Sequence, residues 1–345
     1  MVDYIVVGLG LAGISFCETL RKNNKTFVCY NDDSQRASLV AGGLYNPVIL
    51  KRFTLSWNVN EQLKIANTFY ADLEIFLSIN FDQKLPVLRR FHAPEEQNLW
   101  FEAADKSELK PYLSLQLISN ENTNLNAPIG FGRVLQTGRI DTKVVIDSYT
   151  QYLLEKDLME VETFDHECLE LNNAYLQYKG VKAKQIVFAE GYGLKHNPFF
   201  IQLPLQGSKG EYLIIRSEKL KEKNAIKSSV FIIPMGNHLY KVGANYERTD
   251  KTNRPTVAAR TELIQKLEKV LDCEYEVVDQ VAGVRPTVKD RRPLVGRHPN
   301  HELLYVLNGF GSHGILIGPW AAMSLYEYIE NGIPLNPEMD IKRFE

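Results

Sequence analysis

DYIVVGLGLAG, at residues 3–13, is an apolar strand that runs directly into three glycines, Gly8, Gly10 and Gly13, and then into an amphipathic segment. In a dinucleotide-binding βαβ unit the first glycine permits the tight turn. The second lets the backbone approach a pyrophosphate, and the third lets the helix pack closely on the strand. The N–H groups in the first turn of that helix then face the phosphates. The sequence therefore predicts a dinucleotide site at residues 8–13.

The end of the second strand is the next place to look for a dinucleotide contact. This strand, expected at residues 26–30, usually ends at an acidic residue that binds the ribose hydroxyls. Asn31 stands there instead and Asp32 follows it. The amide of Asn31 can still hydrogen-bond a hydroxyl, so we include both residues among the predicted contacts. With the glycine motif at residue 8, we expect no catalytic domain before it, an arrangement common in FAD enzymes.

The composition is that of an ordinary globular protein of 345 residues, with 44% hydrophobic and 24% charged residues, enough for two domains. The net charge of −2 gives no general attraction to nucleic acid or an anionic membrane. No apolar run is long enough for a membrane helix, and no basic region precedes the apolar start, so we expect neither a membrane anchor nor a signal peptide. The four cysteines form no Cys-x-x-Cys pair and the seven histidines show no ligand spacing. We therefore expect reduced thiols, no metal site and a cytoplasmic location.

Hydrophobic periodicity predicts the remaining elements. A long helix is expected at residues 58–79, a helix capped by Asp141, and a buried parallel strand at 185–189. Residues 206–280 alternate as antiparallel strands with one helix near 256–271. A strand at 303–307, a second glycine turn at 309–314 and a helix at 315–330, ended by Gly332, complete the chain.

The dinucleotide-unit pattern recurs at the start, the middle and the end of the chain, so two interleaved domains are predicted. Residues 1–79, 138–205 and 281–345 would form the cofactor domain. Residues 80–137 and 206–280 would form the substrate domain.

Two C-terminal segments carry a family resemblance. GVRPTVKDRRPLVGRHP (283–299) and LLYVLNGFGSHGILIGP (303–319) resemble the closing segment of the D-amino acid oxidase superfamily. Members with similar segments include glycine oxidase, sarcosine oxidase and the flavin domain of a bifunctional tRNA wobble-uridine modification enzyme. The small-residue run at 41–43, IVFAEG (186–191), KGEYLII (209–215) and FIIPMGNHLYKVGANYE (231–247) follow in the family's order.

The resemblance implies a mixed α/β fold: a glutathione-reductase-like, Rossmann-type FAD domain interleaved with an antiparallel-sheet substrate domain. FAD would be held non-covalently, because no cysteine lies at 284–287, where sarcosine oxidases attach it. Its isoalloxazine would lie between the 41–43 run and the 309–314 turn. The implied cofactor contacts are Gly8, Gly10, Leu11, Ala12, Gly13, Asn31, Asp32, Ala41, Gly42, Gly43, Cys168, Ala189, Glu190, Gly191, Gly309, Gly311, Ser312, His313, Gly314 and Ile315.

The resemblance also implies catalytic residues. Arg285 matches an arginine that binds the substrate carboxylate, and a bidentate guanidinium suits that planar group; the alternative is a structural arginine paired with an acid. His313 would hydrogen-bond flavin or substrate, or would only pack its loop. Lys209 is more simply explained as a surface lysine, whereas Lys51 and Arg52 are explained equally well as a solvated pair or as functional cations. All three could also add positive charge near the site.

Three positions depart from the family pattern. Phe231 replaces a substrate-binding tyrosine, Ser312 replaces a second arginine, and Leu316 replaces a carboxylate-binding lysine. The carboxylate site is therefore expected to have fewer binding groups than in the family, with Arg285 as the main one.

The implied reaction is hydride transfer to flavin from a carbon beside an amine, giving an imine, with oxygen reduced to hydrogen peroxide. The substrate would be a small amine or N-substituted amino acid. Two alternatives stay open: a tRNA-modification oxidase that acts on an N-substituted glycine, and a flavin dehydrogenase of a hydroxy acid or amine with an acceptor other than oxygen.

Overall fold

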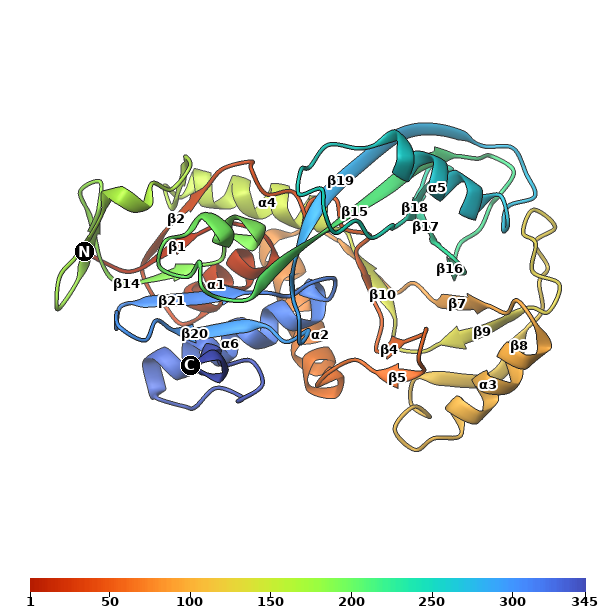
Figure 1. Cartoon of the computed structure of the whole chain (residues 1–345), viewed down its shortest axis with the longest axis horizontal. Coiled ribbons are helices and arrows are strands. Elements are labelled where there is room, and N and C mark those ends of the chain that lie inside the picture. Colours follow the sequence, from red (N-terminus) through yellow and green to blue (C-terminus); the bar gives the residue numbers. More distant parts are fainter.

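Two large β-sheets organise the computed structural model, which describes residues 1–345 (Figure 1). The first sheet has the order β11-β2-β1-β14, and it branches at β14 into β21-β20 and β13-β12. Strands β11, β2, β1, β14 and β21 are parallel, as expected of a doubly wound unit. Its strands are β1 (Val2–Val7), β2 (Phe27–Asn31), β11 (Met159–Val161), β12 (Leu169–Leu171), β13 (Leu176–Tyr178), β14 (Val181–Phe188), β20 (Leu294–Arg297) and β21 (Leu304–Asn308).

Four helices pack together on one face of this sheet. They are α1 (Leu11–Lys22), α2 (Val59–Leu77), α4 (Thr142–Glu155) and α6 (Gly314–Asn331). Helices α1 and α6 approach closely because Gly318 has no side chain: a Cβ there would lie 2.9 Å from Ser15 Oγ. This close packing brings the N-termini of α1 and α6 to the same edge of the sheet.

The second sheet has the order β19-β15-β18-β17-β16-β7-β9-β8 and is antiparallel except for the β16–β7 pair. Helix α5 (Val257–Leu267) packs on one face, and α3 (Pro94–Ala104) contacts β8 at the far edge. The strands are β7 (Val87–Arg90), β8 (Leu113–Ile118), β9 (Phe131–Val134), β15 (Leu205–Arg216), β16 (Ala225–Lys227), β17 (Phe231–Gly236), β18 (Leu239–Gly243) and β19 (Glu276–Val288). In Figure 1 the long strands β15 and β19 run from one half of the molecule to the other.

Short elements connect the two sheets. Strands β3 (Leu44–Tyr45), β10 (Gly138–Ile140) and β6 (Asp82–Gln83) form a small sheet, and β4 (Val48–Ile49) pairs with β5 (Thr54–Leu55). Three 3-10 turns complete the structure: η1 (His166–Cys168), η2 (Gly191–His196) and η3 (Ile341–Phe344).

The fold class predicted from the sequence is confirmed, and so are several local signals. Asp141 caps α4, its carboxylate accepting a hydrogen bond from Val144 N at 3.3 Å. Gly332 ends α6 with φ at +67°. The division at 80–137 and 206–280 stays a prediction; its 280/281 boundary falls inside β19. No helix is long and apolar enough to cross a membrane.

Candidate active site

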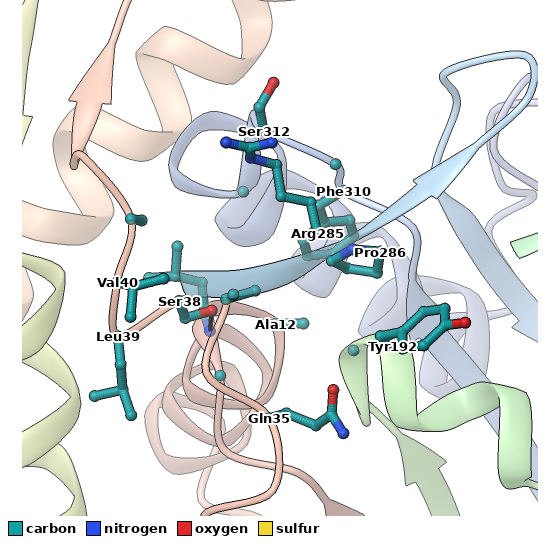
Figure 2. A pocket seen from close by; sticks show the side chains of 18 of the residues that line it. Ala12, Gln35, Ser38, Leu39, Val40, Tyr192, Arg285, Pro286, Phe310 and Ser312 are labelled. Atoms are coloured by element: carbon teal, nitrogen blue, oxygen red, sulfur yellow. Dashed lines mark hydrogen bonds between the residues drawn. The ribbon is translucent and has the colours of Figure 1, made fainter. Parts of the chain in front are cut away.

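A cavity of about 1080 Å³ lies where the first sheet, the second sheet and the N-termini of α1 and α6 meet. In Figure 2, Ala12 and Ser38 line one part of it, Arg285 extends from β19, and Phe310 and Ser312 come from the turn before α6. The carboxyl ends of parallel strands β1, β2, β14 and β21 all open toward this cavity, which is where open α/β sheets bind ligands. Of the predicted cofactor contacts, all but Gly13, Cys168 and Gly309 line it.

The first glycine turn has the geometry needed to hold phosphates. Gly8 has φ of +95°, and a Cβ on Gly13 would lie 1.9 Å from the carbonyl oxygen of Gly8, so the third glycine is what lets α1 follow β1 so tightly. The N–H groups of Ala12 and Gly13 have no hydrogen-bond partner in the chain. Free N–H groups at a helix N-terminus beside a glycine turn are suited to binding a pyrophosphate. The cavity therefore fits the pyrophosphate of FAD.

Two polar side chains brace this turn. Asn31 Oδ1 accepts a hydrogen bond from Leu9 N at 2.8 Å, so the asparagine at the acidic position holds the glycine turn in place. Ser38 Oγ accepts from Leu11 N at 3.2 Å, a contact that the sequence did not reveal. Asp32 accepts from Thr163 Oγ1 at 2.7 Å, which ties the end of β2 to the segment after β11.

The second cluster of cavity residues follows β14. Ala189, Glu190 and Gly191 line the cavity, and Glu190 Oε1 lies 2.9 Å from His166 Nε2. Sequence reasoning placed Cys168 here, but its side chain is exposed, bonds to Asp165 and does not line the cavity. This part of the cavity is lined instead by Thr163, Phe164 and His166. Their only signal in the sequence is that they lie within five residues of Cys168.

The 41–43 run packs against the small sheet β3-β10-β6 and against the second sheet. A Cβ on Gly43 would lie 2.1 Å from Ile140 O, and one on Gly42 would lie 2.9 Å from Ile233 Cδ1. Lys241 Nζ, on β18, donates to the carbonyl oxygen of Ala41 at 2.9 Å. Burial lowers the pKa of Lys241 to about 8, with the positive charge of Arg139 acting in the same direction. Sequence analysis did not identify Lys241.

The second glycine turn presents the N-terminus of α6 to the cavity. Gly309 lies behind it, where a Cβ would meet Val288 at 2.8 Å, so this glycine shapes the turn without lining the cavity. The N–H groups of Ser312, Gly314 and Ile315 have no partner in the chain. These free donors and the positive end of the helix dipole favour negative charge in the cavity.

His313 lines the cavity at the start of α6, and its ring makes no hydrogen bond within the chain. Desolvation lowers the pKa of this imidazole, and the nearby positive charge of Arg291 lowers it further. The lowered pKa favours the neutral imidazole, which has one N–H donor and one acceptor nitrogen.

Arg285 projects from β19 opposite Ser208 and has no carboxylate within 4.0 Å. Its Nη1 donates weakly to Asn245 O at 3.4 Å, and its Cζ lies 4.7 Å from the centre of the Tyr246 ring. Gly210 makes room for it, since a Cβ there would lie 1.7 Å from Nη2. The alternative of a structural arginine paired with an acid is therefore wrong.

Lys209 corrects another expectation, because it is not a surface residue. Its side chain is fully buried, with Nζ 2.5 Å from Asp250 Oδ2 and 3.6 Å from Glu211 Oε1. It does not line the cavity, so it binds no substrate there. It fastens the 245–256 loop, which carries the residues that contact Arg285.

Other substrate-side positions lie as follows. Phe231, Lys51 and Arg52 line the cavity, whereas Leu316 is buried and does not. Sequence reasoning missed Lys227, a cavity residue at the end of β16.

Comparisons with known proteins agree with this geometry. The family model described as "FAD dependent oxidoreductase" (DAO) matches residues 3–327. Glycine oxidase of Bacillus subtilis is 25% identical over 351 residues, which cover 95% of this chain and 93% of that protein. The tRNA 5-methylaminomethyl-2-thiouridine biosynthesis bifunctional protein MnmC of Legionella pneumophila is 21% identical over 96% of this chain, but the match spans only 55% of that protein.

Among solved structures, glycine oxidase from Geobacillus kaustophilus superposes with a TM-score of 0.81 at 17% identity, covering 100% of this chain and 98% of that one. Iminodiacetate oxidase from Chelativorans sp. superposes with a TM-score of 0.80 at 16% identity, covering 97% and 98%. These two likenesses concern the fold.

Proposed function

The chain belongs to the DAO family of FAD-dependent oxidoreductases, and on that premise we propose that it oxidises a small amine or an N-substituted amino acid. The product would be an imine that hydrolyses in water, and oxygen would be the acceptor, yielding hydrogen peroxide. Membership of the family supports the reaction class, and the residues of the cavity indicate the substrate class.

The substrate class is inferred from one observation: Arg285 lines the cavity without an acid partner. A half-buried guanidinium without a counter-ion is costly unless a ligand supplies one. Its planar fork suits a carboxylate, and Tyr246 and Asn245 O hold it in place. An amine that carries a carboxylate therefore fits best.

The residues of the chain would divide the work as follows. Gly8, Gly10 and the free N–H groups at α1 would hold the pyrophosphate of FAD. When bound, FAD supplies the acceptor for the hydride that leaves the carbon beside the nitrogen. The free N–H groups at the start of α6 would stabilise negative charge on the isoalloxazine. Neutral His313 would hydrogen-bond flavin or substrate and would leave the substrate amine free of a competing positive charge.

A peroxide-coupled assay on the purified holoenzyme tests this function. The panel comprises glycine, N-methylglycine, D-alanine and proline, with the corresponding amines that lack a carboxylate. We expect activity that depends on the carboxylate, and a fall of about a hundred-fold or more in kcat/KM for Arg285→Met, because charge-assisted bonds contribute about 1.5–3 kcal/mol each. Arg285→Lys keeps the charge, so its kcat/KM should lie between those of the wild type and Arg285→Met. No oxidation of any compound and no anaerobic bleaching of the flavin would reject the proposal.

The same experiment separates an oxidase from a dehydrogenase. Fast anaerobic bleaching by substrate followed by very slow recovery in air would assign another acceptor. The cofactor is proposed to be non-covalent, since none of the four cysteines lines the cavity. Acid precipitation should then leave the yellow colour in the supernatant.

A second candidate is oxidation of an N-substituted glycine within tRNA, which the likeness to MnmC favours. The exposed cations Lys51 and Arg52 at the cavity would suit a phosphate backbone. Binding of tRNA that weakens steeply with salt would support this candidate, and the absence of any binding at low salt would remove it.

A further inference from the structure

The charged residues of the cavity are separated by sign. Three acids line it, Asp32, Glu162 and Glu190, and none lies on the second sheet. Five cations line it on the second sheet and in nearby loops: Lys51, Arg52, Lys227, Arg285 and Arg291. None of the five has a carboxylate within 4.0 Å. This part of the cavity carries more positive charge than one substrate carboxylate would neutralise.

Lys227 is the cation for which a counter-ion is most clearly missing. It ends β16, between Arg89 on β7 and Phe231 on β17. Its Nζ donates only to Ser228 O, at 2.8 Å, and lies 4.7 Å from the centre of the Phe231 ring. Burial lowers the pKa of Lys227 to about 8, and the positive charges of Arg89 and Lys266 lower it further.

The two cations that repel Lys227 are themselves paired. Arg89 Nη2 lies 3.3 Å from Glu96, and Lys266 forms an ion pair with Glu262. Lys227, by contrast with these two, has no such partner. An unpaired, largely desolvated ammonium is destabilising by itself, so the cavity side is where its counter-ion would come from.

Lys51 and Arg52 lie toward the same end of the cavity. Phe53, the next residue, contacts Trp100 edge-on with ring centres 6.0 Å apart. Trp100 packs over Gly132, which is the cross-strand neighbour of Arg89. The loop between β4 and β5 therefore reaches the strands that hold Lys227. We call Lys51, Arg52 and Lys227 the distal cationic cluster.

An apolar surface separates this cluster from the strand of Arg285. Phe231 pairs with Gly243, and Gly243 pairs with Tyr212, so the sheet offers a ring, a gap without a side chain, and a second ring. All three residues line the cavity. Such a surface suits methylene groups and offers no charged group that would need a partner.

We propose that the substrate carries two anionic groups: one bound by Arg285 beside the amine, and a second, on an alkyl spacer, bound by Lys227 in the distal cationic cluster. The substrate class is therefore an N-(ω-carboxyalkyl) amino acid or a related amine with two anionic ends. This inference rests on the proposed function for the oxidation, but the second anion site is defined by the cavity alone.

Binding to the holoenzyme tests the site without turnover. The probes are malonate, succinate, glutarate and adipate, each compared with the monocarboxylate of equal chain length, by calorimetry and by the change in flavin absorbance. We expect one spacer length to bind roughly ten- to hundred-fold more tightly than its monocarboxylate, as for a hydrogen-bonded charge pair. A phosphonate of the same spacer length distinguishes a carboxylate site from a phosphate site. The proposal would be overturned if no dicarboxylate or phosphonate bound more tightly than its monocarboxylate. This comparison uses the wild-type protein alone.

Variants locate the site. In Lys227→Met, which keeps the length of the side chain, the gain in affinity of the dicarboxylate over the monocarboxylate should be lost. It should persist in Lys227→Arg and in Lys64→Met, a control at an exposed lysine of α2. A gain that survives Lys227→Met unchanged would also overturn the proposal.

Kinetics then connect the site to turnover. N-(2-carboxyethyl)glycine and its longer homologues are compared with N-propylglycine and the matching N-alkylglycines. Lys227→Met should raise KM for the dianionic substrate with kcat little changed, and should alter the N-alkylglycines less than about two-fold. If no amine is oxidised while dicarboxylates still bind through Lys227, the proposed function fails and this inference stands.

Discussion

Replacing Lys209 by methionine removes a buried ammonium and leaves its partners in place. Lys209 is fully buried, and its Nζ bonds to Asp250 Oδ2 at 2.5 Å and to the carbonyl oxygen of Arg254. Glu211, also buried, lies 3.6 Å away and would lose its nearest cation. Breaking a buried ion pair by deleting one partner usually costs about 3–5 kcal/mol.

Two local features reduce that figure. Glu211 keeps three hydrogen bonds, two from Thr256 and one from Gln280, and the Asp250 side chain is 30% exposed and can regain water. We therefore expect a loss of about 2–4 kcal/mol in the free energy of unfolding, or roughly 1 M in the urea midpoint for a chain of this size. KM should also rise, because the loosened 245–256 loop contacts Arg285.

Urea unfolding of the holoenzyme, followed by far-UV circular dichroism, measures the loss. Lys219→Met is the matched control, since that lysine forms only an exposed pair with Glu274. The double variant Lys209→Met/Glu211→Gln removes the uncompensated charge and should regain a good part of the stability. A Lys209→Met midpoint within 0.2 M of the wild type, or a double variant no more stable than the single one, would refute the reasoning.

The same network predicts an acid dependence. The hydrogen bond from Lys209 lowers the pKa of Asp250 to about 2, with further hydrogen bonds from Thr252. A lowered carboxyl pKa contributes stability that is present above the unfolded value near 3.8 and is lost as the pH falls through about 2. This acid-side contribution should be smaller in Lys209→Met when unfolding is measured between pH 5 and pH 2.

Three further predictions concern the turns and caps. Gly13→Ala places a Cβ against the Gly8 carbonyl, so purified protein should lose most of its FAD, measured as the ratio of absorbance at 450 nm to that at 280 nm; unchanged FAD content would contradict this. Asp141→Ala should cost about 1 kcal/mol or more of unfolding free energy, because it removes both the α4 cap and the ion pair with Arg139, whereas Asp141→Ser restores the cap alone and should recover only part of the loss; equal loss in both would argue against the cap. Because the pKa of His313 is lowered, unfolding free energy should rise as pH increases from 5 to 7, and His313→Gln should lack that part of the rise; identical pH profiles would rule it out.

Local signals in the sequence were sufficient for the elements and for the cofactor side. The strand, glycine turn and helix at residues 2–22, the Asp141 cap and the Gly332 end depend on residues close in sequence, and each was predicted. The fold class and the FAD assignment also needed the resemblance of the C-terminal segments, because the glycine turn alone fits any dinucleotide.

Long-range contacts explain what was missed. Lys209 reads as a surface lysine because its partner Asp250 is 41 residues away and is brought to it by a loop. Lys241 reaches the carbonyl of Ala41 across 200 residues. Lys227 becomes a cavity residue only because β16 pairs with β7, and no local sequence pattern predicts that pairing.

The paired strands β15 and β19 determine how this molecule can open. All twelve residues of β15 pair with residues of β19, with one register shift between Ile214 and Ile215, and the pair passes from one half of the protein to the other (Figure 1). Because both strands cross together, a motion of one half relative to the other would have to bend the paired strands while their ladder of hydrogen bonds stays intact. The two paired strands therefore hold Arg285 in a firm position, and we expect substrate entry and product exit to involve the 245–256 loop, whose Tyr246 is 71% exposed. Turnover limited by product release would be governed by that loop and not by a hinge between the two halves.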